Sequence, residues 1–194
     1  MRLLRPTTEA DMIAVFLKAE IESDRFGNTI LTLLEQHGKS RTLVDVPDLS
    51  NRAENVYRRH LLDSYRAYVF EELPRHISWY RAVLDRDEVR NIRYIDYSYW
   101  NELSNHTRLP HVATAAIRAG REIYGQPTDG FLRVAQALRE GARFPELIVL
   151  GAVPTAALTV YEGHLRLTAF MLAPECIPDE LEVIAGFAPE CADI

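Results

Sequence analysis

Hydrophobic residues recur at helical spacing through most of the first ninety positions of the chain. The first run follows Thr8, a residue type that caps helices, with Asp11 three positions later. A longer run predicts a helix from about residue 51 to residue 73, which Pro74 ends. The apolar positions of the first run are Ile13, Phe16, Leu17 and Ile21.

The longer helix carries several arginines opposite its apolar face. Arg58, Arg59 and Arg66 fall on that side, and we expect them to form a solvated surface, with a binding patch as the less favoured alternative. Its apolar face consists of Tyr57, Leu61, Tyr65, Tyr68 and Val69.

The second half of the chain alternates predicted strands and helices, which is typical of an α/β protein. The last helix is followed by Pro174, and Gly141 is a suitable C-terminal cap for an earlier one. We therefore expect an N-terminal helical region, residues 1–90, packed on a core of residues 91–194. The predicted strands are residues 92–97, 147–150, 158–161 and 181–184, and the predicted helices are residues 110–120, 131–141 and 163–172.

Composition limits the classes of protein that the chain can represent. It has 194 residues, 47% of them hydrophobic and 26% charged, which suits a folded domain with a sizeable core. A net charge of −6 disfavours general nucleic-acid binding, which needs a basic surface. Two cysteines cannot build a disulfide scaffold, and no run approaches the length of a signal peptide or a membrane span. These features favour a cytoplasmic protein without a membrane partner.

The most informative segment is residues 158–169, where a predicted strand runs through Gly163 into a predicted helix. The first amides of a helix have no partners within it, so they can bind an anion, and a glycine lets a phosphate approach the backbone. His164 and Arg166 would add donors, and Glu162 could act as a base or hold a metal. In the alternative interpretation, Gly163 only makes a tight turn and Arg166 pairs with a surface carboxylate.

This segment resembles the G-x-x-R box of the ParB/sulfiredoxin superfamily, in particular its D-G-H-H-R variant. The matching residues run from Val160 to Ala169, with Glu162, Gly163, His164 and Arg166 in the box positions. The order of predicted elements over about residues 90–188 agrees with that fold. The resemblance implies a ParB/sulfiredoxin-like core that binds nucleotide phosphates through Gly163, His164, Arg166 and Thr168.

Departures from the superfamily's patterns narrow the function that the resemblance implies. Sulfiredoxins have a catalytic cysteine where this chain has His164, and partitioning proteins follow the box with a DNA-binding domain. The small-molecule kinase branch fits the box best, although its second histidine is Leu165 here. If the box holds phosphates, loss of the Arg166 side chain should weaken nucleotide binding more than it weakens the fold.

A second polar cluster, residues 100–108, follows the first strand predicted in the second half. Glu102 is the candidate base for phosphoryl transfer, and Arg108 could clamp a carboxylate or phosphate. The resemblance places substrate-facing groups in this loop, here Ser104, His106 and Thr107. The alternative is a hydrogen-bonded loop that caps the following helix.

These observations predict a nucleotide- or phosphate-binding protein, with a small-molecule phosphotransferase as its enzymatic form. The six histidines are scattered, so we expect no protein-only metal site, although a nucleotide could bring Mg²⁺. The partners would be a nucleotide and a small-molecule substrate, and a homodimer is left open. A non-catalytic ligand-sensing or protein-interaction module is the alternative, and a nucleic-acid-associated ParB-like protein is less favoured.

Overall fold

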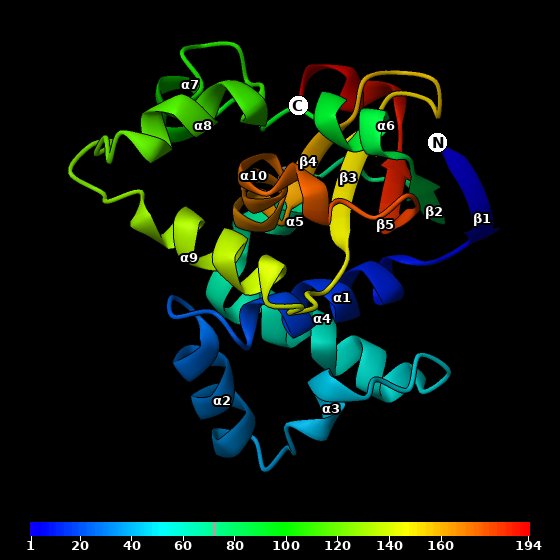
Figure 1. Ribbon diagram of the computed structural model, residues 1–194. Helices are drawn as coiled ribbons and strands as arrows, with labels where there is room; N and C mark the ends of the chain where they lie inside the picture. Colours follow the sequence, from blue (N-terminus) through cyan, green and yellow to red (C-terminus); the bar gives the residue numbers. More distant parts are fainter. Residues whose placement is uncertain (72) are drawn as a thin grey trace.

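A mixed sheet organises the computed structural model, which describes residues 1–71 and 73–194 and has five strands within them (Figure 1). Parallel pairing joins the third and fifth strands, and the other neighbours are antiparallel. The expected α/β class is confirmed. In spatial order the strands are β1 (Arg2–Pro6), β2 (Ser78–Leu84), β5 (Leu181–Phe187), β3 (Leu147–Gly151) and β4 (Thr159–Glu162).

Both faces of the sheet are covered by helices. Side chains alternate along a strand, so Ile148 and Leu150 of β3 face one layer while Leu147 and Val149 face the other. One layer contains α1 (Glu9–Glu20), α2 (Gly27–Gln36), α3 (Thr42–Asp45), α4 (Arg52–Arg66) and α5 (Tyr68–Glu71). The other contains α6 (Arg86–Asn91), α7 (Ser98–Leu103), α8 (Pro110–Arg118), α9 (Asp129–Arg139) and α10 (His164–Leu172).

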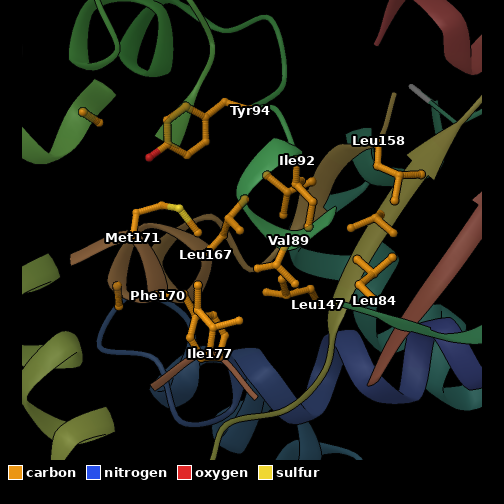
Figure 2. Close-up of a cluster of buried hydrophobic side chains, with 14 of the residues drawn as sticks. Leu84, Val89, Ile92, Tyr94, Leu147, Leu158, Leu167, Phe170, Met171 and Ile177 are labelled. Atoms are coloured by element: carbon orange, nitrogen blue, oxygen red, sulfur yellow. The ribbon is translucent and has the colours of Figure 1, made fainter. Parts of the chain in front are cut away.

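The apolar core of the second layer positions α10 over the sheet. Figure 2 shows Leu167 and Met171 of this helix in the same group of buried side chains as Val89, Ile92 and Leu147. Tyr94 lies above the helix, with its hydroxyl directed toward it. Short 3-10 turns follow at Pro174–Cys176 and Pro189–Asp193. In the described residues, no helix combines the length and apolar content that crossing a bilayer requires.

The sequence predicted the first helix correctly. The Thr8 hydroxyl accepts a hydrogen bond from the Asp11 amide at 3.3 Å, and the apolar stripe behind it is buried. The helices predicted at residues 110–120, 131–141 and 163–172 and the strand at residues 181–184 are also present, each with slightly different ends.

The strand predicted at residues 92–97 is wrong. Only Arg93 makes a bridge, to Thr159, and the backbone of Tyr94 bonds to Arg108 instead of to a neighbouring strand. The first ninety residues supply β1 and β2, which the helical interpretation of this region missed. Arg81 interrupts the apolar pattern of β2, which is why the pattern did not indicate a strand.

Arg81 lies within the sheet, and two carboxylates neutralise its charge there. Its guanidinium donates to both carboxylate oxygens of Asp11 at 2.7 Å and to Glu146 at 2.8 Å. Burial opposes ionisation of Asp11, but the bonds from Arg81 prevail and lower the pKa of that carboxyl. The bidentate pair with Asp11 joins α1 to β2, and the bond to Glu146 joins β2 to the segment that enters β3.

The arginines of α4 do not share one solvated face. Arg58 is fully buried, and its guanidinium donates to the carbonyls of Leu43 and Asp48 at 3.0 and 2.9 Å. Arg66 is mostly buried and pairs with Glu20. The expected surface was therefore wrong for two of the three residues. A helical pattern shows which residues share a side, but not what later packs against that side.

We expect Arg58→Met to lower the free energy of unfolding by about 3 kcal/mol, because the carbonyls of Leu43 and Asp48 lose a charged donor whose side chain is fully buried. Urea unfolding would measure this as a lower midpoint at constant slope. Arg52→Ala, an exposed position in the same helix, is the control and should change stability by less than about 0.5 kcal/mol. Equal losses in the two variants would contradict the structural role of Arg58.

Candidate functional site

The junction between β4 and α10 has the local structure that the sequence predicted. The strand ends at Glu162, Gly163 has a φ of 105°, and the helix begins at His164. A Cβ atom on Gly163 would lie 2.5 Å from a methyl carbon of Leu147 and 2.9 Å from the guanidinium of Arg166. Both the left-handed backbone and the close packing therefore require glycine here.

Arg166 folds back against this junction. Its guanidinium donates to the carbonyl of Pro145 at 2.9 Å and to the carboxylate of Glu162 at 3.2 Å, and the residue is only 7% exposed. Burial lowers the pKa of Arg166, and the nearby carboxylates, Glu162 first, oppose that shift. These contacts agree with the alternative interpretation, in which Arg166 pairs with a carboxylate. They join α10 to the end of β4 and to the segment before β3.

His164 lies in an aromatic group with Trp100 and Tyr94. Its ring is nearly parallel to Trp100 at 4.7 Å between centroids and to Tyr94 at 6.1 Å. Burial, together with the positive charges of Arg66 and Arg166, lowers its pKa to about 3, so the imidazole is neutral at physiological pH. Among the described residues, nothing bonds to its buried Nε2.

Thr168 is fully buried one turn further along α10. Its hydroxyl donates to the carbonyl of His164 at 2.7 Å and lies 2.6 Å from the hydroxyl of Tyr94, which therefore donates to it. Burial raises the pKa of Tyr94, so this phenol stays protonated. The Thr168 hydroxyl thus makes internal bonds and links the helix to the Tyr94 segment.

The loop that follows α7 is held mainly by its own hydrogen bonds. Glu102 is paired with Arg121. Ser104 is buried and donates to the carbonyl of Trp100 at 2.7 Å, while Thr107 donates to the carbonyl of Ser104 at 2.7 Å. The Thr107 hydroxyl also accepts from the amide of Leu109, the residue that caps α8. The loop is therefore hydrogen-bonded internally, as in the alternative interpretation, but no described side chain caps α8.

The remaining two candidates of this loop differ in exposure. His106 is exposed and has a φ of 59°. Arg108 is half-buried, donates to the carbonyl of Tyr94 at 2.7 Å, and also donates to the carbonyl of Ile194. The guanidinium of Arg108 thus holds two backbone segments together.

The two predicted clusters meet through aromatic contact. Trp100, at the start of the loop cluster, lies against His164 of the box, so the two segments pack directly against each other there. Two cavities lie elsewhere in the described residues. One, of about 270 Å³, lies beside Thr8 and Trp79, and the other, of about 180 Å³, lies beside Ile117 and Leu132.

The N-terminus of α10 nevertheless retains a property of an anion site. No described side chain accepts a hydrogen bond as a cap at the start of α10, and its first turn contains no acidic residue. Thr8, Asn51 and Asp85 cap α1, α4 and α6, whose first turns are acidic, whereas within the described residues α2, α7 and α8 start without a side-chain cap or an acidic first turn, as α10 does. In the first turn of α10 the Leu165 side chain is 42% exposed, while Gly163 before it and Arg166 after it are buried.

A buried polar cluster beside the junction was missed by the sequence interpretation. Glu20 of α1 is 4% exposed, accepts from the hydroxyl of Tyr65 at 2.6 Å and pairs with Arg66. The carboxylate of Glu162 is close enough to influence the pKa of Glu20. Its position was a usable signal, because Glu20 falls one turn after Phe16 and Leu17 on the apolar stripe.

Within the described residues, no group of three or more His, Cys, Asp or Glu side chains is arranged to hold a metal ion. Comparison of the chain with protein-family models, curated proteins and solved structures finds no match.

The contacts of Arg166 revise the expected effect of removing it. We expect Arg166→Met to lower the free energy of unfolding by about 3 kcal/mol, since the Pro145 carbonyl and Glu162 lose their donor. Urea unfolding measures the loss. Arg133→Ala removes an exposed arginine from α9 and should cost less than about 0.5 kcal/mol. An Arg166→Met variant that is as stable as the parent would show that these bonds do not stabilise the fold.

The neutral state of His164 predicts a pH-dependent stability. Its pKa is about 3 in the folded chain and 6.5 when unperturbed, so the unfolded chain binds more protons between these values. Stability from His164 is complete above about pH 6.5 and falls with acidification by at most about 1.4 kcal/mol per pH unit. Urea titrations of the parent and of His164→Phe should diverge accordingly. A stability difference that is constant from about pH 4 to 6.5 would contradict this.

Proposed function

We propose that the protein binds the phosphate of a nucleotide at the first turn of α10. The observation that carries this proposal is the uncapped start of that helix directly after β4, with Gly163 in a left-handed conformation. Free amides and the positive end of the helix dipole favour an anion at such a position.

Two arginines contribute positive charge near this turn, although each is also paired with a carboxylate. Arg66 and Arg166 both lower the pKa of His164, which means that their positive charge reaches the start of the helix. Arg166 would contribute through this charge and by holding the junction, since its own donors bond to Pro145 and Glu162. The backbone amides would make the direct contacts to the phosphate.

The resemblance to the ParB/sulfiredoxin box supports the same location. In that superfamily the box binds nucleotide phosphates at a helix N-terminus, and this chain has glycine and arginine at the matching positions, Gly163 and Arg166. Leu165 occupies the place of the second histidine and is exposed. A ParB/sulfiredoxin-like core is accordingly part of the proposal.

Phosphoryl transfer would be the enzymatic form of this function. Glu162 adjoins Gly163 and is the nearest candidate base along the chain, and its carboxylate is paired with an arginine, as is that of Glu102. Ser104, His106, Thr107 and Arg108 stay the candidates for contacts to the acceptor. Mg²⁺ would arrive with the nucleotide, because that ion needs few protein ligands.

A second candidate, a non-catalytic ligand-sensing or interaction module, is favoured by one observation. The polar groups of Arg166 and Thr168 that would serve chemistry are engaged within the protein. An enzyme would transfer or hydrolyse phosphate when Mg²⁺ and a hydroxyl acceptor are present, and a sensor would bind the nucleotide without turnover. Product analysis after incubation with nucleotide therefore separates the two candidates.

Substitution of Leu165 tests the phosphate site without disturbing the core. We expect Leu165→Glu to weaken nucleotide affinity about tenfold, because it places a carboxylate beside the amides. Leu165→His restores the second histidine of the box and should tighten binding about threefold near pH 6. Isothermal titration with adenosine and cytidine di- and triphosphates, with and without Mg²⁺, measures both effects.

Two controls separate charge from position. Leu165→Gln has the size of the glutamate variant without its charge and should bind nearly as the parent does. Leu132→Glu adds the same charge at an exposed position of α9 and should also leave affinity unchanged. If Leu165→Glu binds nucleotide with the parent's affinity, the phosphate site is not at the first turn of α10, even if the protein binds nucleotide elsewhere.

A further inference from the structure

The cavity of about 270 Å³ lies where the chain leaves β1 to begin α1, against the segment that enters β2. The amide of Thr7 donates to the carbonyl of Trp79 at 2.8 Å, which fixes the two segments on either side of the cavity. Trp79 is buried in the cavity wall, whereas Thr8, Glu9 and Arg75 are lining residues that are exposed. The cavity therefore opens to solvent through a polar rim.

The volume of this cavity suits a small organic molecule. An apolar cavity of about 150 Å³ holds a benzene ring, and pockets for drug-sized ligands begin at about 300 Å³. A cavity of about 270 Å³ thus accommodates roughly a dozen non-hydrogen atoms. A whole nucleotide is larger than that, so this cavity differs in kind from the phosphate site proposed at α10.

Arg75 supplies an uncompensated positive charge to the rim. It makes no hydrogen bond or ion pair with any residue that the structure describes, whereas Arg81 of β2 is paired with two carboxylates. Arg75 is also the only cation among the described residues that line the cavity. A free guanidinium binds a carboxylate through two parallel hydrogen bonds. The first requirement on a ligand is therefore a carboxylate.

The other polar groups of the rim favour hydroxyl groups on the ligand. Glu9 pairs through one carboxylate oxygen with Arg59, which leaves its other oxygen as an acceptor. The Thr8 hydroxyl accepts from the Asp11 amide at 3.3 Å, and its own hydrogen is donated to no described group. An acceptor and a donor at the rim match the two functions of a hydroxyl group. The Glu9 carboxylate also disfavours a second negative charge on the ligand.

We propose that this cavity is a binding site for a small organic acid that carries one carboxylate and several hydroxyl groups. The carboxylate bonds to the guanidinium of Arg75, and the hydroxyl groups bond to Glu9 and Thr8 at the rim. Trp79 forms the wall behind the ligand. The inference goes beyond the proposed function and does not depend on it, because none of the residues at the start of α10 lines this cavity.

Three six-carbon probes separate the two features of the ligand. Gluconate has the carboxylate and the hydroxyl groups, sorbitol has a further hydroxyl in place of the carboxylate, and hexanoate has the carboxylate alone. We expect isothermal titration to give gluconate a Kd of about 1 mM, and sorbitol and hexanoate at least about tenfold weaker binding. Failure of gluconate to bind would overturn the inference. Equal affinity for gluconate and either of the other two probes would overturn the ligand class.

Charge substitutions at the rim test the location of the carboxylate. Arg75→Gln retains hydrogen-bonding capacity and loses the charge, so gluconate affinity should fall about tenfold or more. Glu9→Gln retains an acceptor, removes the repulsion and frees Arg59, so affinity should rise about threefold. His76→Gln changes an exposed neighbour of Arg75 that does not line the cavity, and it should bind as the parent does. The parent's affinity in Arg75→Gln, or weaker binding in Glu9→Gln, would contradict the site.

A filled cavity provides a test that does not depend on charge. Leu73 is a half-buried lining residue, and Leu73→Trp would place an indole in the space that the ligand needs. We expect this variant to lose gluconate binding, with urea unfolding as the check that it is folded. A folded Leu73→Trp variant that binds gluconate with the parent's affinity would show that the acid binds elsewhere.

Discussion

The pairing of β2 with β5 is the contact on which the rest of the fold depends. All seven residues of β2 are in register with β5, which in turn pairs along β3, so the sheet is assembled from both ends of the chain. This pairing brings the α1–α5 layer against one face while α6–α10 cover the other. It also places Arg81 in the sheet beside Asp11 and Glu146, which neutralise it from two different segments. The two carboxylates offset the cost of placing this largely buried arginine in the strand.

Charged groups within the protein serve two purposes. Arg58 and Arg166 bond to carbonyls that no helix or strand satisfies, so they replace regular hydrogen bonding where the chain turns. Glu20 and Arg66 instead form a pair in which one member has a strongly shifted pKa. The first kind of group stabilises the chain at every physiological pH. In the second, burial raises the pKa of Glu20 to about 7, inside that range.

The β4–α10 junction combines structural contacts with the property that favours an anion. Gly163 is required by the packing of Leu147 and Arg166, and His164 is held against Trp100 and is neutral. These contacts fix the direction of the helix and leave its first amides without a cap. Arg166 would therefore act on a bound anion by positioning the start of the helix and through its charge. The backbone amides would make the direct contact.

The sequence by itself determined the local elements whose signals lie within a few residues. The Thr8 cap, the glycine between β4 and α10, and the apolar stripes of α1 and α9 were predicted correctly, because capping and helical periodicity are local properties. Only the tertiary structure decided which polar residues are internal. β2 was missed because Arg81 has partners far away in sequence, and residues 92–97 were taken for a strand although their backbone bonds to Arg108. The partners of Arg166, Glu20 and Arg58 likewise come from other turns, helices and loops. A polar side chain is exposed or buried according to whether distant groups satisfy its charge, and that depends on the packing of whole layers.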